Sequence, residues 1–272
     1  MYLRSVIIFL GKSTGNRISN GILIKMPKTI FMETPWDGEI VLGDEFIDEL
    51  KNRGVKKVAL FASVQFLHLD SVVEKISSLG IEVLTTRAKR TNAQIQVLGC
   101  DAYHDSYKEN IIEESDVIVY IGDGLFHPKA IVLSQRESKN KKDVIIWDPV
   151  SVKMQILTGK TVEAQVKKTI ANLKRFIAAR TVGIIVTLKP GQQYMDVAKK
   201  LKEHLKSQDK ECYIFVDDLV KLEQFENYPF IEAWVNTACP RIGLDDHVHT
   251  PKPLINSREA FDPVAALEKL AD

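Results

Sequence analysis

Cysteine is the residue type in this sequence best suited to metal or redox chemistry, and the chain of 272 residues has three. Cys100 and Cys239 come soon after apolar runs typical of buried strands, whereas Cys212 lies inside such a run. Parallel α/β sheets bind ligands at the carboxyl ends of their strands, which makes Cys100 and Cys239 candidate metal ligands. For Cys100 the alternative is a small buried hydrophobic residue, and for Cys212 we predict that role.

The metal that these thiolates would select depends on the other ligands available. Soft thiolates favour zinc or an iron–sulfur cluster. His104 follows Cys100, and His247 and His249 follow Cys239, so the sequence leaves zinc open. Histidines in loops are, however, more often exposed than bound to metal. The absence of a CxxC motif excludes a zinc ribbon and a thioredoxin-type site.

Strands alternate with helices along two stretches of the chain, and these elements must position the cysteines. The first stretch has apolar blocks at 58–62, 81–84, 95–98, 116–121 and 143–147. The second has apolar blocks at 181–187, 212–216 and 233–235. Short apolar blocks are typical of parallel strands covered on both faces. The sequence therefore predicts an α/β fold of repeated small parallel-sheet domains, which would bring Cys100 and Cys239 together if the domains pack face to face.

A helix is predicted between the two stretches, from about Thr161 to Ala179. Its apolar face repeats at the helical period and consists of Val162, Val166, Ile170, Leu173 and Ile177. We place one α/β domain at residues 51–160 and another at 161–272. Residues 1–50 have too few elements for a third complete domain and are predicted to be a partial first domain or an N-terminal extension.

The composition excludes several classes of protein. Lys and Arg number 37 against 36 Asp and Glu, and the formal charge of +1 provides no global attraction to nucleic acid or to an anionic membrane. The apolar runs are shorter than the roughly 20 residues of a membrane span. With few, widely spaced cysteines, the sequence favours a reducing, cytoplasmic location.

Several segments taken together resemble a known family. They are Ser63–Gln65, Ile95–Cys100, Gly122–Pro128 and Asn236–Ile242, the last followed by Asp245 and Asp246. In this order they look like the diphthamide biosynthesis enzymes that transfer a 3-amino-3-carboxypropyl group in the first step. The resemblance extends from about Pro27 to Asp272, and the segments at 122–128 and 236–242 are the most specific.

The resemblance implies three similar α/β domains, each giving one cysteine to a central 4Fe-4S cluster. Such enzymes cleave S-adenosylmethionine reductively and attach the 3-amino-3-carboxypropyl radical to a histidine of translation elongation factor 2. Cys100 and Cys239 become the second-domain and third-domain ligands by this resemblance. Six further residues become candidates for binding the substrate or ordering the domain junction, with loop capping as their alternative role: Gln65, Asp123, His127, Lys189, Gln192 and Asp245.

One departure from the family pattern concerns the first cysteine. No cysteine precedes Cys100, so the third ligand would come from a partner chain or a separate first domain, in a homodimer or a heterodimer with a homologous chain. The leading hypothesis is thus a transferase or a subunit of one. The alternatives are a non-catalytic paralogue acting as a partner subunit and a zinc-binding α/β protein.

Overall fold

The computed structural model describes residues 35–189, 191–245 and 250–271, together with the backbone of four short strands nearer the N-terminus. These strands are β1 (Ile8–Leu10), β2 (Asn16–Ser19), β3 (Ile22–Lys25) and β4 (Lys28–Ile30). β1 pairs with β4 and β2 pairs with β3, both antiparallel. The predicted unit at 1–50 includes residues 1–34, and apart from these four strands that segment lies outside the described residues.

The first large sheet has five strands in the order β6-β5-β7-β8-β9. Its strands are β5 (Lys57–Ala62), β6 (Glu82–Thr85), β7 (Val117–Ile121), β8 (Val144–Asp148) and β9 (Lys153–Leu157). The first four run parallel, and β9 pairs antiparallel with β8. Every residue of β7 is buried, which agrees with a parallel strand that is covered on both faces.

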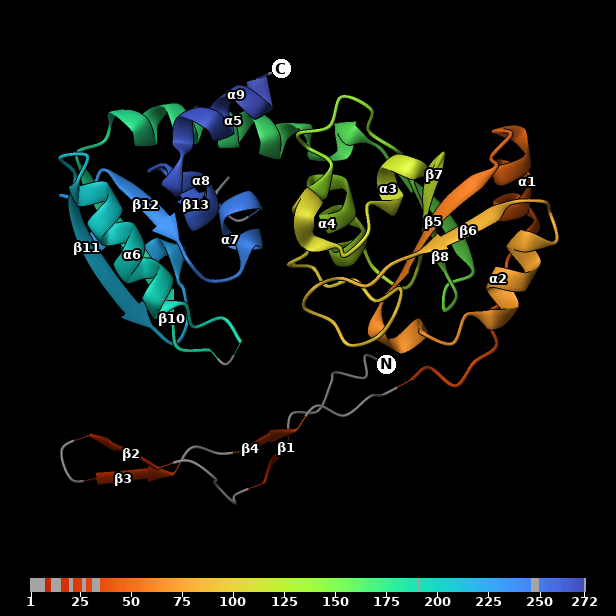
Figure 1. Cartoon of the computed structure of the whole chain (residues 1–272), viewed down its shortest axis with the longest axis horizontal. Helices are drawn as coiled ribbons and strands as arrows, with labels where there is room; N and C mark the ends of the chain where they lie inside the picture. Colours follow the sequence, from red (N-terminus) through yellow and green to blue (C-terminus); the bar gives the residue numbers. More distant parts are fainter. Residues whose placement is uncertain are drawn as a thin grey trace.

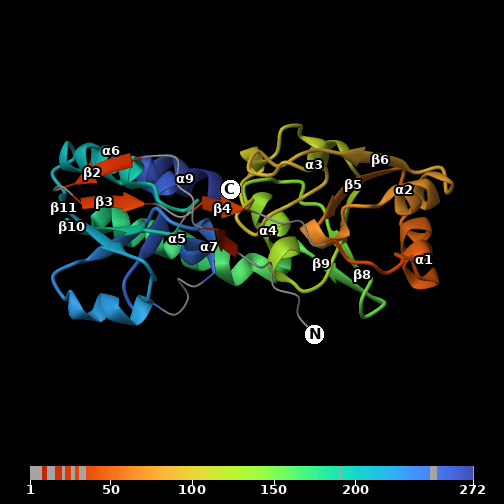
Figure 2. The ribbon, with the colours of Figure 1, turned by 90° about the horizontal axis from the view of Figure 1, so that it is seen from below.

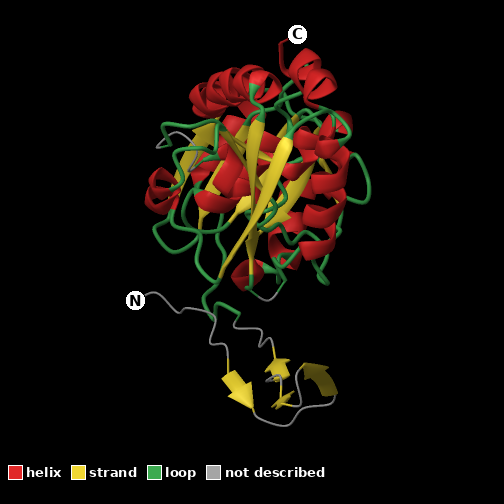
Figure 3. Cartoon of the chain, turned by 90° about the vertical axis from the view of Figure 1, so that its left-hand side faces the viewer, coloured by secondary structure: helices red, strands yellow, loops and turns green. Residues whose placement is uncertain are grey.

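Helices pack on both faces of this sheet, since alternate residues of β7 belong to two different core clusters; the helices of the whole chain surround its strands in Figure 3. Those of this first unit are α1 (Asp44–Asn52), α2 (Asp70–Ser77), α3 (Ile111–Glu114) and α4 (Phe126–Ser134), with short 3₁₀ helices η1 (Val64–Phe66) and η2 (His104–Ser106). Phe46 and Leu50 of α1 pack in the same core cluster as Val119 of β7, and Trp36 lies against this cluster. Residues 35–52 therefore pack on the first sheet.

The second large sheet has four strands in the order β11-β10-β12-β13, all parallel. They are β10 (Thr181–Thr187), β11 (Glu211–Asp217), β12 (Ala233–Asn236) and β13 (Leu254–Asn256). The helices of this unit are η3 (Gly159–Val162), α5 (Glu163–Ala178), α6 (Met195–Lys206), η4 (Leu222–Asn227), α7 (Pro240–Leu244), α8 (Ser257–Phe261) and α9 (Pro263–Ala271). Cys212 is buried in the core of this sheet, as its place within a strand predicts.

The two sheets repeat one topology. In each, the first strand lies between the second and the third, and the fourth strand follows the third. Figures 1 and 2 show the two units side by side, with α4 of the first unit and α7 of the second near the junction. The prediction of an α/β fold with repeated parallel sheets is confirmed. The sheets fall on either side of residue 160, but the exact domain boundaries stay a prediction.

Some predicted elements are wrong in detail. The apolar block Ile95–Leu98 forms no strand: the only pairing there is a single bridge between Gln96 and Ala62. Ile95 has φ 58°, a left-handed conformation that ends an extended run. In α5 the buried positions include Leu173 and Phe176, whereas Ile177 is 37% exposed, so the buried face is rotated from the predicted one. The helix α4 and the antiparallel strand β9 were not predicted from the sequence.

Among the described residues, no helix is both long enough and apolar enough to cross a membrane.

Candidate metal centre

The thiols of Cys100 and Cys239 meet at the junction of the two units. Their Sγ atoms lie 3.9 Å apart, and both side chains are partly buried. A disulfide has an S–S bond of about 2.05 Å, so these are two free thiols that share a weak hydrogen bond. Two soft sulfur ligands, separated by 139 positions along the chain, thus point at one place between the sheets.

The two cysteines occupy different topological positions within their units. Cys100 lies in the connection that leads from β6 to β7, whereas Cys239 comes directly after β12, at the N-terminus of α7. In the first unit, the place that corresponds to Cys239 follows β7 and holds Gly122 and Asp123. The pair is therefore formed by the packing of the two units and is not a symmetric repeat of one motif.

The electrostatic surroundings favour one thiolate in the pair. Hydrogen bonding to Cys100 lowers the pKa of the Cys239 thiol to about 6, assisted by the backbone N–H and the charge of Arg241 and opposed by burial. The same bond, together with burial, raises the pKa of Cys100. A thiolate is the form that binds metal, and the shared hydrogen bond together with the charge of Arg241 favours its formation in this pair.

Arg241 joins the two units beside the cysteines. From α7 its Nη1 donates to the carbonyl oxygens of Phe126, at 2.6 Å, and of Gly99, at 3.3 Å. Its guanidinium lies 4.4 Å from the centroid of the Phe126 ring, and its Nε donates to Asp245 at 2.6 Å. The other carboxylate oxygen of Asp245 is buried with no hydrogen-bond partner among the described residues. Asp245 therefore orients Arg241, and its role in ordering the junction or binding the substrate stays a prediction.

Sequence reasoning did not single out Arg241 as a site residue. The available signal was its position in a helical turn after Cys239-Pro240, four residues before Asp245, a spacing that lets two side chains of a helix meet. Gly99 supports the same contact, because a Cβ atom there would lie 1.9 Å from the ring of Phe126. Only glycine leaves room for the ring on which the guanidinium rests.

Asp123 and His127 lie at the β7–α4 connection, close to Arg241. Burial lowers the pKa of His127; the carboxylate of Asp123 opposes this change, and the charge of Arg241 adds to it. The imidazole is therefore neutral at pH 7. The structure thus brings Asp123, His127 and Asp245 to the same side of the junction as the cysteine pair.

The other three predicted residues lie in connections of their own. The side-chain oxygen of Gln65 accepts a hydrogen bond from Ser63 at 3.1 Å, and the Gln65 carbonyl accepts one from the backbone N–H of Trp36. Lys189 and Gln192 lie in the β10–α6 connection, where the Gln192 backbone N–H donates to the Lys189 carbonyl at 3.0 Å. Neither side chain has a hydrogen bond or ion pair with the described part of the chain, so their substrate-binding role stays a prediction.

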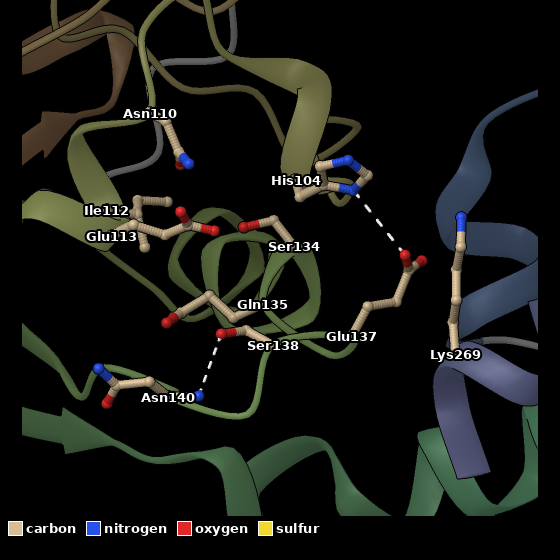
Figure 4. Close-up of a pocket in the computed structure, with 10 residues that line it drawn as sticks. All are labelled: His104, Asn110, Ile112, Glu113, Ser134, Gln135, Glu137, Ser138, Asn140 and Lys269. Carbon is tan, nitrogen blue, oxygen red and sulfur yellow. Dashed lines mark hydrogen bonds and ion pairs between the residues drawn. The ribbon is translucent and has the colours of Figure 1, made fainter. Parts of the chain in front are cut away.

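The histidines that kept zinc open do not join the cysteines in the described residues. His104 points toward Glu137, with 3.9 Å between Nδ1 and Oε2, and lines a separate cavity of about 330 Å³ (Figure 4). His247 and His249 lie outside the described residues. Among the residues that are described, no three His, Cys, Asp or Glu side chains are grouped closely enough to hold a metal ion.

A second cavity adjoins the Cys239 turn. It has a volume of about 220 Å³ and is lined from both units, by Arg90 and Tyr103 of the first and by residues of the second that include Tyr194, Thr237 and Asn256. A polar, arginine-containing cavity beside two thiols is suited to an anionic or zwitterionic small molecule. Its residues were not predicted from the sequence.

The sequence and the fold both match proteins of one known group. The profile of the family described as "Putative diphthamide synthesis protein" matches residues 6–268. The chain belongs to the diphthamide synthesis family. The expected resemblance is therefore confirmed over nearly the whole chain.

Two curated proteins and one solved structure show the degree of similarity to this chain. The 2-(3-amino-3-carboxypropyl)histidine synthase of Pyrococcus horikoshii is 31% identical, over 79% of this chain and 59% of that protein. The protein of the same name from Methanocaldococcus jannaschii is 27% identical, over 81% of this chain and 56% of that protein. The crystal structure of Dph2 from Pyrococcus horikoshii with a 4Fe-4S cluster has a TM-score of 0.65 at 27% identity, covering 82% of this chain and 60% of that chain. The chain thus spans less than two thirds of the length of these relatives.

The residues at the junction fit part of the ligand set of a 4Fe-4S cluster. Cys100 and Cys239 provide two convergent thiolates, the ligand type that such clusters use. Cys212 is excluded as a third ligand, because it is buried within the core of the second sheet. The described residues therefore provide two sulfur ligands.

Proposed function

We propose that this chain is a 2-(3-amino-3-carboxypropyl)histidine synthase or a subunit of one. Its substrates would be S-adenosylmethionine and a histidine of translation elongation factor 2. The observation that carries the proposal is the meeting of Cys100 and Cys239, from two different units, in a member of the diphthamide synthesis family. A relative with a 4Fe-4S cluster and a TM-score of 0.65 supports it.

When bound, a 4Fe-4S cluster would supply the electron for reductive cleavage of S-adenosylmethionine. The chain's own part is to hold and shield that centre. Cys100 and Cys239 would ligate it, and Arg241 would keep the two cysteine loops in contact through its bonds to Gly99 and Phe126. The cavity with Arg90 and Tyr194 would receive the substrate's charged methionine end.

Two cysteines are fewer than the three that the family pattern implies. We propose that a further ligand comes from a homologous partner chain or from a separate first domain, in a homodimer or a heterodimer. The expected location is the cytoplasm, where thiols remain reduced and elongation factor 2 is present.

Anaerobic reconstitution with iron and sulfide tests the metal assignment. We expect an electron paramagnetic resonance signal of a reduced 4Fe-4S cluster, from the chain alone or mixed with a homologous chain, and loss of this signal in Cys100→Ala and Cys239→Ala. Cys212→Ala is the matched control and keeps the signal, because this thiol packs in the second core. Transfer of the 3-amino-3-carboxypropyl group is then measured with dithionite, S-adenosylmethionine and elongation factor 2. No transfer by the chain alone or by its mixture with a homologous chain would refute the proposed enzyme activity.

A zinc site is the second candidate, and the short Sγ–Sγ distance favours it. Two thiolates on one tetrahedral zinc ion, with Zn–S bonds of about 2.3 Å, lie about 3.8 Å apart, close to the 3.9 Å observed. Stoichiometric zinc in the purified chain, with no iron uptake, would establish this function in place of the cluster. No metal uptake together with tight binding to a homologous chain would instead indicate a non-catalytic subunit.

A further inference from the structure

We propose that Tyr103 and Asn256 are positioning residues that hold the two cysteine loops so that the two thiols stay next to each other. The purpose of this positioning rests on the proposed function, whereas its geometry rests on buried contacts of the described residues. Both residues lie at the junction, one in each unit. Neither contacts a cysteine side chain, so their effect passes through the backbone of the loops.

The Cys239 loop is held by two asparagine amides. Asn236 Nδ2 donates to the Cys239 carbonyl at 2.8 Å and to Asn256 Oδ1 at 2.7 Å, and Asn236 Oδ1 accepts the N–H of Ala238 at 3.0 Å. Asn256 Nδ2 donates to the Pro240 carbonyl at 2.9 Å. The turn that carries Cys239 is therefore fixed from both sides by the ends of β12 and β13.

The Cys100 loop is held by a buried arginine and a buried tyrosine. Arg136 Nη1 donates to the Ala102 carbonyl at 2.6 Å, and its Nη2 donates to Glu259 at 3.0 Å. The hydroxyl of Tyr103 donates to the same carboxylate, at 3.1 Å to Oε1 and 3.2 Å to Oε2. Tyr103 is 7% exposed and lies three residues after Cys100.

One bond closes the connection between the two loops. Asn256 Nδ2 donates to the Tyr103 hydroxyl oxygen at 3.1 Å, so that this oxygen both accepts from the Cys239 side and donates to Glu259. A polar path thus leads from the Ala102 carbonyl through Arg136, Glu259 and Tyr103 to Asn256. It ends at the Pro240 carbonyl, one residue after Cys239.

Because the hydrogen-bonded groups of this path are buried, they favour one arrangement of the two loops. Arg136 and Glu259 have side chains only 2% and 5% exposed, and a buried polar group that loses its partner has no water to replace it. A shift of either loop would therefore leave several groups unpaired at once. The same loops carry the two thiols, so the network fixes their separation.

Capture of a dithiol reagent tests the separation directly and needs no cluster, S-adenosylmethionine or elongation factor. Phenylarsine oxide binds two neighbouring thiols: two As–S bonds form, the As–O bond breaks, and the oxygen leaves as water with the two thiol protons. We expect the reduced full-length chain to form this bridge between Cys100 and Cys239. In Tyr103→Phe and in Asn256→Asp the half-saturating concentration should rise about tenfold, because the thiols are no longer pre-positioned.

Tyr107→Phe is the matched control. Its hydroxyl is also buried and donates to the Asp101 carbonyl at 3.1 Å, but this bond stays within the first unit. For Tyr107→Phe, the half-saturating concentration of phenylarsine oxide should remain within about twofold of that of the unmodified chain. The free energy of unfolding should nevertheless fall by a similar amount in both tyrosine variants. Circular dichroism and N-ethylmaleimide labelling of both thiols verify that each variant is folded and reactive.

The two tyrosine variants decide between positioning and plain stabilisation. Equal capture by Tyr103→Phe and Tyr107→Phe would refute the positioning role, and if Tyr103→Phe fails to fold, the comparison is made with Asn256→Asp. A chain with normal capture and no transferase activity would refute the proposed function and leave the positioning role intact.

Discussion

Arg241 connects the two units beside the cysteine pair through two backbone carbonyl groups. Its side chain is 5% exposed and contacts Asp245 on its own helix and Phe126 and Gly99 on the other unit. A buried guanidinium is tolerated only with such a set of partners, because the charge is costly to remove from water.

Replacing Arg241 should destabilise the chain more than replacing an exposed arginine. Arg241→Met keeps an apolar stem but leaves the carboxylate of Asp245 and two carbonyl groups without donors. We expect a loss of about 2–3 kcal/mol in the free energy of unfolding, measured in urea. The control Arg53→Met removes partly exposed ion pairs with Glu49 and Asp143 and should cost less than about 1 kcal/mol. Equal losses would contradict the role of Arg241.

The pH dependence of stability should include a contribution from His127. Burial lowers its pKa in the folded chain, so between the folded and unfolded pKa values the unfolded state binds more protons. The contribution of neutral His127 to the stability of the folded chain is fully present above the unfolded pKa of about 6.5. It declines as the pH falls toward the lower pKa of the folded chain. We expect His127→Gln to reduce the loss of stability between pH 7.5 and pH 5, measured as the urea midpoint.

Asp123→Asn provides the opposite control for His127. The Asp123 carboxylate opposes the lowering of the His127 pKa, so its removal should make the decline toward pH 5 steeper. A decline in His127→Gln that equals that of the unmodified chain would show that another group is responsible.

The central strands of each sheet are the elements that position the junction. β5 and β10 each lie between two parallel neighbours. Cys100 lies in the connection after β6, beside β5, and Cys239 follows β12, beside β10. In the second sheet, Gly183 of β10 faces Trp234 of β12 in register. A Cβ atom at Gly183 would lie 2.3 Å from the buried indole ring, so this pair of strands depends on a glycine.

Gly183→Ala should therefore weaken the second sheet. We expect a loss of about 1–3 kcal/mol in the free energy of unfolding, because the buried Trp234 ring has to move. Gly159→Ala is the control: its Cβ would meet only the flexible end of the Lys141 side chain, at 3.2 Å. That substitution should change stability by less than about 1 kcal/mol. Thermal and urea unfolding measure both, and a neutral Gly183→Ala would contradict the packing argument.

At the scale of the whole molecule, polar contacts link the two units. The buried ion pair of Arg136 with Glu259 and the contacts of Arg241 all cross between them. Each sheet also has a core cluster that lies within its own unit, so each unit has the means to stay folded when the junction opens. A further cluster of the first unit includes Leu244 of α7, so apolar packing also crosses the junction. Cooperative unfolding of the chain should depend on the crossing contacts.

Glu259→Ala should separate the unfolding of the two units. The substitution leaves the charge of Arg136 buried without its partner, a defect that costs about 3–5 kcal/mol in other proteins. We expect one calorimetric transition in the unmodified chain and two in the variant. Hydrogen exchange should assign the earlier transition to the strands of one sheet.

The exposed pair of Arg258 with Asp105 is the matched control, since it also crosses the junction. Its side chains are 43% and 47% exposed, so Asp105→Asn should cost less than about 1 kcal/mol and preserve a single transition. A single transition at an unchanged temperature in Glu259→Ala would show that the buried pair does not couple the units.

Local patterns were sufficient to predict much of the fold. Short apolar blocks such as 117–121 and 181–187 become buried parallel strands, because a strand covered on both faces needs apolar residues at every position. The block at 95–98 has the same composition but forms no strand, since Ile95 adopts a left-handed conformation in the long connection before β7. In α5, tertiary packing buries Phe176 and exposes Ile177, although the helical period alone allows either.

The sequence by itself determined the α/β class, the repeated alternation, the family resemblance and the separation of Cys212 from the other two cysteines, because each of these depends on residue types at short spacing. Only the tertiary structure decided that Cys100 and Cys239 lie 3.9 Å apart, and that Arg241, Tyr103 and Asn256 hold their loops. These contacts join residues more than a hundred positions apart, and no local pattern specifies how two units pack. The partners of a buried polar group are therefore known only once the fold has brought them together.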